Sequence, residues 1–76
     1  MLISDTIIEN YKAAEIALDH NMSEQEAAAT WFRETLYEED FNEHPKPTYS
    51  RFVLKIDEEI SLYIDYYAGY YFAVKS

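Results

Sequence analysis

The chain has 76 residues, enough for one small domain with a thin core, and it contains no cysteine, which excludes disulfides and thiolate zinc sites. Eight tyrosines, four phenylalanines and one tryptophan must therefore supply much of that core. Fifteen acidic residues against six basic ones give a net charge of −9, which argues against direct binding to nucleic acid or to a membrane and favours a basic protein partner.

The sequence also bears on location. No apolar run approaches the roughly 20 residues that cross a bilayer. The first ten residues lack the basic start and the cleavage site of a secretory signal. A cytoplasmic location is therefore expected.

Residues 1–40 are predicted to form a helical hairpin. Apolar residues recur at helical spacing between Ser4, a candidate cap, and Asn21, which breaks the pattern. Ser23 and Glu26 have the spacing of a capping box and predict the start of a second helix. The residues expected to form the core are Leu18, Trp31, Phe32, Leu36, Leu62 and Ile64.

Residues 41–49 are predicted to be a connector, because Pro45 and Pro47 cannot lie inside a helix. The remaining residues, 50–76, are rich in β-branched and aromatic side chains and predict a three-stranded antiparallel meander. The expected fold is thus a single α+β domain, with the helical hairpin packed on the meander. An all-α alternative remains open, in which residues 57–70 contain a third helix.

The register of the meander is predicted from its apolar face. A three-residue loop at 67–69, with Gly69 at positive φ, would pair Ile64 with Phe72 and make one face wholly apolar. Tyrosines and basic residues would then share the other face. Three residues of this face form a secondary candidate for binding: Arg51, Tyr63 and Tyr71. Tyrosine and arginine are enriched in interface cores, so this face could bind protein or self-associate. Ordinary cross-strand pairing is the alternative.

The main candidate site is an acidic tract after the second helix. Between Glu34 and His44 the chain has five acids and no lysine or arginine. Negative charge at a helix C-terminus opposes the macrodipole, so local stability does not account for these residues. The predicted partner-binding residues are Glu34, Tyr37, Glu38, Glu39, Asp40 and Glu43. The alternative is a solvated loop, partly neutralised by Lys46 and Arg51.

No catalytic, cofactor or metal site is predicted, and the chain is not expected to be an enzyme. Neither His20 nor His44 is part of a recognisable arrangement of nucleophile and base. The single glycine excludes a glycine-rich phosphate loop. Asp40 and His44 could stack as metal ligands, but Pro45 ends that helix and no second element completes a coordination sphere.

The sequence favours a small acidic inhibitor or adaptor that occupies a basic, nucleic-acid-binding surface of a partner protein. Carboxylates four residues apart on a helix rise about 6 Å, close to two nucleotide steps of about 3.4 Å. In size, acidity and aromatic content the chain resembles small phage-encoded proteins that block host defence, including anti-CRISPR proteins and DNA mimics, which act in the host cytoplasm. The alternative is a homo-oligomeric structural or regulatory domain, a homodimer included, whose acidity only aids solubility.

Overall fold

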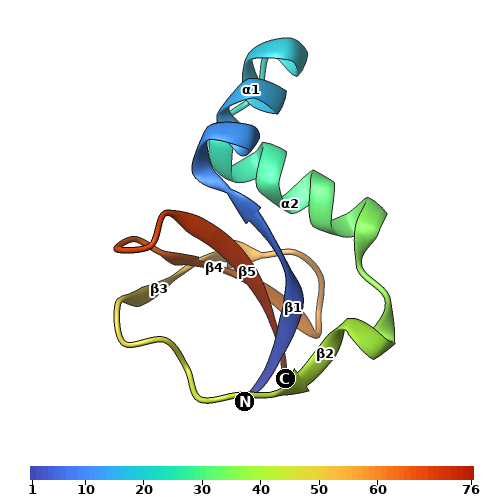
Figure 1. The fold of residues 1–76 in the computed structure, drawn as a ribbon. Helices are drawn as coiled ribbons and strands as arrows, with labels where there is room; N and C mark the ends of the chain where they lie inside the picture. Colours follow the sequence, from blue (N-terminus) through green and yellow to red (C-terminus); the bar gives the residue numbers. More distant parts are fainter.

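The computed structural model describes all 76 residues. It shows a five-stranded antiparallel sheet with the second helix along one face, while the first helix projects beyond the end of the sheet (Figure 1). The strands are β1 (Leu2–Glu9), β2 (Phe41–Glu43), β3 (Ser50–Lys55), β4 (Ile60–Asp65) and β5 (Tyr70–Lys75). The helical elements are α1 (Asn10–His20), α2 (Glu24–Thr35) and the short 3-10 helix η1 (Glu38–Asp40). The strand order is β2-β1-β5-β4-β3. The α+β class is confirmed, and the all-α alternative is excluded.

The N-terminal residues depart from the prediction of a helical hairpin over 1–40, because β1 precedes the first helix. β1 inserts between β2 and β5, and it pairs Ile3 with Val74 and Ile8 with Tyr71. Its β-branched side chains favour a strand, which pairs with β5 on one side and, over residues 2–4, with β2 on the other. The hairpin therefore consists of α1 and α2 alone, and the sheet has two more strands than the predicted meander.

Ser4, the predicted helix cap, instead fills an irregularity in β1. The register between β1 and β5 shifts between Ile3 and Ile7. The Ser4 hydroxyl is buried there; it accepts a hydrogen bond from the Ala73 amide at 2.9 Å and donates one to the Thr6 carbonyl at 2.7 Å. The side chain thus supplies a partner that the interrupted ladder does not give to Ala73.

The meander of β3, β4 and β5 is confirmed, but its second turn is one residue longer than predicted. Asp65 pairs with Tyr70, so the loop holds residues 66–69, with Gly69 at φ +84° as expected. The Asp65 carboxylate accepts the Tyr67 and Ala68 amides at 3.1 and 2.9 Å and so fixes the turn.

This slip of one residue exchanges the two faces of β5. Tyr71 and Ala73 lie in the cluster beneath the helices, whereas Phe72 and Val74 lie on the opposite face. The apolar pattern could not reveal the register, because β5 is the central strand and is apolar on both faces. Four consecutive residues of β5, Tyr71 to Val74, are buried.

The core beneath the helices is built on alanines and a few large side chains. Small residues let the helices approach each other and the sheet closely. The fully or nearly buried members are Ile8, Ala13, Ala28, Ala29, Phe32, Ile56, Leu62, Tyr71 and Ala73. Of the predicted core, Phe32 and Leu62 are fully buried, and three residues are partly buried against it: Trp31, Leu36 and Ile64. Leu18 was wrongly placed in the core and is 84% exposed on α1.

The sheet face opposite the helices is crossed by the connector between β2 and β3, which are the two edge strands (Figure 1). The Lys46 ammonium lies 5.9 Å from the ring centroid of Tyr63 on this face. The Tyr49 carbonyl accepts the Tyr66 amide at 3.0 Å and anchors the far end of the connector. No helix of the structure is long and apolar enough to span a bilayer.

Candidate functional site

The sequence suggests that the second helix runs on into the acidic tract, but the tract is not part of α2. α2 ends at Thr35, Leu36 is extended, and Glu38–Asp40 form the separate helix η1. The Asp40 carboxylate accepts the Tyr37 amide at 2.8 Å, which gives Asp40 a structural role at the start of η1. The acids of η1 therefore do not lie at the C-terminus of α2, and the macrodipole of α2 does not disfavour them as predicted.

Most of the tract is nevertheless exposed and poorly neutralised. Tyr37 is 66% exposed, and Glu38 and Glu39 are also exposed. Glu38 has one basic neighbour, the Lys75 ammonium at 3.4 Å, and Glu39 has no ion pair. Glu43 pairs with the N-terminal amine at 2.5 Å while its side chain stays largely in solvent. The tract thus offers exposed carboxylates around an exposed tyrosine.

The fold adds a second group of acids to this end of the sheet. The Ser76 amide, at the end of β5, donates to the Glu59 carbonyl at 2.9 Å, and the preceding Lys75 reaches Glu38. The β3–β4 turn and η1 therefore both contact the C-terminal end of β5, although the sequence indicated only a connection at residues 57–59. We call this region the acidic end, and it comprises Tyr37, Glu38, Glu39, Glu43, Glu58 and Glu59.

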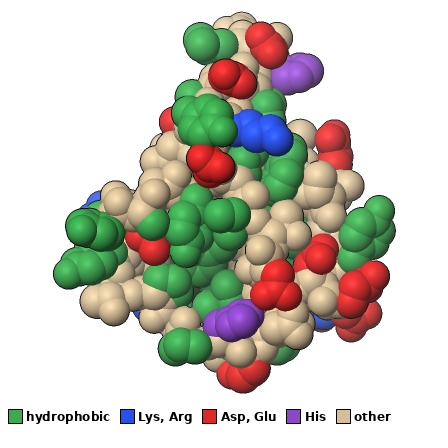
Figure 2. All heavy atoms as spheres, viewed as in Figure 1, with side chains coloured by type: hydrophobic (Ala, Val, Ile, Leu, Met, Phe, Trp, Pro, Cys, Tyr) green, Lys and Arg blue, Asp and Glu red, His purple; other side chains and the backbone are tan.

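Figure 2 shows part of the acidic end, with acidic side chains gathered along the lower right of the view, over η1 and β2. Little Lys or Arg is visible among them. The basic side chains nearby are Lys75 and Lys55, and Lys55 donates to the Glu58 backbone carbonyl at 3.3 Å instead of forming an ion pair. The sequence could not reveal this convergence, because it depends on strand order.

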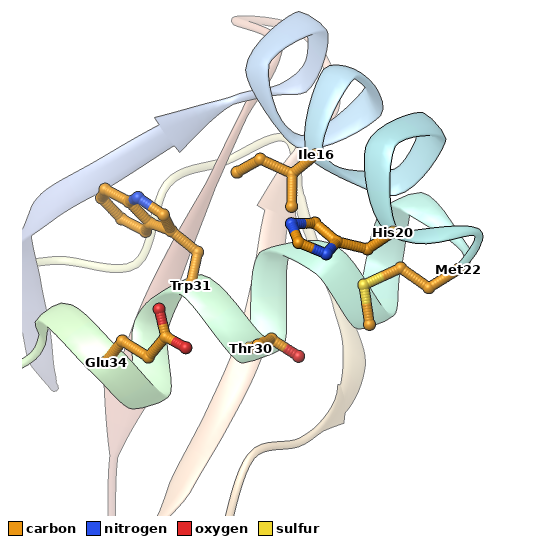
Figure 3. A pocket seen from close by; sticks show the side chains of 6 residues that line it. All are labelled: Ile16, His20, Met22, Thr30, Trp31 and Glu34. Carbon is orange, nitrogen blue, oxygen red and sulfur yellow. The ribbon is translucent and has the colours of Figure 1, made fainter.

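Glu34, also a predicted site residue, lies apart from the acidic end. It lines a groove of about 330 Å³ between α1 and α2, shown in Figure 3. The groove is lined by Ile16, His20, Met22, Thr30, Trp31 and Glu34. The Lys12 ammonium lies 6.0 Å from the Trp31 ring centroid. The structure thus divides the predicted tract between two places.

The predicted secondary face of Arg51, Tyr63 and Tyr71 does not form, because the register slip moves Tyr71 to the helix side. Tyr71 is only 1% exposed, and its hydroxyl donates to the Glu24 carboxylate. Burial, reinforced by that bond and the charge of Glu24, raises the pKa of Tyr71. Tyr63 is half-buried on the opposite face, 5.7 Å from the ring of Phe72.

Arg51 instead joins a different group of tyrosines near the β4–β5 turn. Its guanidinium lies 4.6 Å from the ring centroid of Tyr66. Tyr49 packs between two rings, at 6.1 Å from Tyr66 and 5.1 Å from Tyr67. All four side chains are exposed, and this combination is common in protein interfaces.

Polar clusters elsewhere are small. His44 lies 3.0 Å from the Asp5 carboxylate, which also accepts a hydrogen bond from Asn42, at an exposed edge of the sheet. No three His, Cys, Asp or Glu side chains are grouped so that they could hold a metal ion.

Comparisons with protein-family models, with curated proteins and with solved structures found no match.

Proposed function

We propose that the chain is an acidic protein-binding module, an inhibitor or adaptor, whose acidic end occupies a basic surface of a partner protein. The supporting observation is the convergence of two acidic segments, η1–β2 and the β3–β4 turn, at one end of the sheet. Their carboxylates are exposed and have few cationic neighbours. A basic partner would meet a concentrated negative potential there.

The physical benefit of such a surface lies in association. Exposed ion pairs contribute little to the stability of an isolated domain, about 0–1 kcal/mol each. A cluster of like charges, in contrast, steers an oppositely charged partner and speeds encounter at low salt. Tyr37, exposed among the acids, can add a buried aromatic contact once the partner is bound.

A basic surface that normally holds nucleic acid is the finer form of this proposal. A phage-encoded anti-defence inhibitor, of the anti-CRISPR or DNA-mimic type, would act in this way. The overall charge of −9 supports a partner of this kind. The regular spacing of carboxylates along one helix no longer contributes, because the acids lie on a 3-10 turn, a strand and a hairpin turn.

Capture of partners from a lysate at low and moderate salt tests the proposal. The bait is compared with Glu38→Lys/Glu39→Lys and with Glu15→Lys/Asp19→Lys, which makes the same charge change on exposed positions of α1. We expect the first variant to lose salt-sensitive partners that the second retains. Equal capture by both variants would contradict a role for the acidic end.

A second candidate function, self-association, is favoured by the exposed cluster of Arg51 with Tyr49, Tyr66 and Tyr67. Association through tyrosines depends little on salt, unlike binding through the acidic end. Sedimentation of the wild type and of Tyr49→Ser/Tyr67→Ser at two salt concentrations distinguishes the two functions. A dimer that persists at high salt and is lost in the variant would support self-association.

A further inference from the structure

The groove between α1 and α2 has the dimensions of a site for one side chain. Its volume of about 330 Å³ lies at the lower end of the range for small-molecule sites, about 300–1,000 Å³. Ile16 and Met22 give it apolar walls, and the indole of Trp31 forms one side (Figure 3). A volume this small suits a single side chain better than a nucleotide or a cofactor.

The groove also carries an uncompensated negative charge. Figure 3 shows the Glu34 carboxylate on α2, below Trp31 and on the same side of the groove. Glu34 takes part in none of the ion pairs of the structure, so its charge is available to a cation from outside. A carboxylate next to an aromatic face is suited to a group that is both positively charged and flat.

Trp31 already has a cation nearby. The Lys12 ammonium lies 6.0 Å from the ring centroid, at the outer limit of a cation–π contact. Tryptophan is the aromatic side chain that attracts cations most strongly. Because Lys12 contacts the ring only at this limit, we expect a cation that also pairs with Glu34 to displace it.

We infer that this groove binds one arginine side chain of the basic partner protein. The guanidinium pairs with the Glu34 carboxylate and lies against Trp31, while the aliphatic stem packs on Ile16 and Met22. Arginine fits better than lysine, because its planar group can bond a carboxylate at two points and stack on a ring. The inference rests on the proposed function, since it names one residue that the partner presents.

The test uses blocked arginine, N-acetyl-arginine N-methylamide, as the probe and blocked citrulline as its uncharged control. Trp31 is the only tryptophan, so its fluorescence reports on the groove directly. We expect a saturable change with a Kd on the order of 1 mM, as suits so small a ligand. Citrulline should bind about tenfold more weakly, because the charge-assisted bond is lost.

Variants identify the residues responsible. Glu34→Gln should weaken arginine binding about fivefold or more, whereas Glu39→Gln, the same change at the acidic end, should leave it unaltered. Lys12→Gln should strengthen binding, because it removes a competing cation. Both glutamates are exposed, so each variant is expected to fold, and thermal melting verifies this.

The outcomes separate the inference from the proposed function. No saturable response, an equal response to citrulline, or a response that survives Glu34→Gln would overturn the arginine site. If that occurs while Glu38→Lys/Glu39→Lys still slows partner association, the proposed function stands without it. If arginine binds as expected but the acidic end proves irrelevant to the partner, the proposed function fails and the groove remains an arginine site.

Discussion

The hydroxyl of Tyr71, in the central strand β5, donates a hydrogen bond to the carboxylate of Glu24 in the first turn of α2. The two residues are 47 positions apart, and their bond joins the helical layer to the sheet. Tyr71 is almost fully buried, so its hydroxyl has no access to bulk water. The bond therefore fixes where α2 begins on the sheet.

Removing this hydroxyl should destabilise the domain. Tyr71→Phe keeps the ring in the core but leaves the partly buried Glu24 carboxylate without its donor. We expect a loss of about 1–3 kcal/mol in the free energy of unfolding, measured in urea. Tyr67→Phe is the matched control, because Tyr67 is 81% exposed and its hydroxyl makes no hydrogen bond to the protein. A similar loss in both variants would contradict the role of the Tyr71–Glu24 bond.

The same pair predicts how stability changes at alkaline pH. The pKa of Tyr71 in the folded state is raised above the ordinary value of 10.0, by burial first and then by Glu24. The folded state therefore retains this proton after the unfolded state has lost it. The contribution of protonated Tyr71 to the free energy of unfolding is complete below pH 10 and is progressively lost as the pH rises above 10. Thermal melts from pH 8 to 11 should show a shallower decline for Tyr71→Phe than for the wild type. Parallel declines would show that Tyr71 does not contribute.

The buried hydrogen bond between the Ser4 hydroxyl and the Ala73 amide should also stabilise the domain. Ser4→Ala deprives the Ala73 amide of its acceptor inside the sheet, so we expect a loss of about 1–3 kcal/mol in unfolding free energy. Hydrogen exchange should show that the Ala73 amide in particular becomes less protected. Thr48→Ala, at an exposed position of the connector, serves as the control. Unchanged protection of Ala73 would mean that Ser4 has no such role.

Gly69 tests the turn between β4 and β5. Its φ is +84°, and a Cβ added there meets no atom within 4 Å, so any cost of substitution comes from backbone strain alone. Gly69→Val should therefore lower the unfolding free energy by more than about 1 kcal/mol. Ala68→Val, one residue earlier at an exposed position with negative φ, should cost much less. Equal melting temperatures for the two variants would contradict the strained turn.

Local signals in the sequence predicted local structure well. The Ser23 hydroxyl accepts the Glu26 amide at 3.1 Å at the start of α2, which is one of the two bonds of the predicted capping box. Gly69 has positive φ because it is the last residue of the tight turn before β5, a position that favours glycine. Both features depend on residues within a few positions of one another, so neighbouring side chains were sufficient to specify them.

Features that depend on distant partners were missed. The spacing of Ile3 and Ile7 fits a helix face as well as a strand, although Ile8 fits the helix poorly, and pairing with β5 and β2 selects the strand. The register of β5 was ambiguous because both of its faces are buried. The candidate site changed for the same reason: strand order brings Glu58 and Glu59 toward η1, and the end of α2 leaves Glu34 in the groove.

The acidic end predicts one variant that loses partner binding while its stability hardly changes. Glu38→Lys/Glu39→Lys removes the ion pair between Lys75 and the exposed side chain of Glu38. The same variant relieves repulsion among neighbouring acids. These effects are small and of opposite sign, so the unfolding free energy should change by less than about 0.5 kcal/mol. Association with the partner captured from lysate should slow about tenfold at low salt, and the difference should shrink as salt screens the charges.

The control for this prediction is the charge-matched variant Glu15→Lys/Asp19→Lys on α1. If the total charge alone governs association, both variants will slow it equally, and the acidic end has no special role. If the acidic end docks on the partner, only the first variant will also speed dissociation, because it removes contacts made in the complex. Stopped-flow association and surface-based dissociation rates on the two variants distinguish these results. Slower association without faster dissociation would limit the acidic end to steering, and unchanged rates would leave the cluster of Arg51, Tyr49, Tyr66 and Tyr67 as the binding surface.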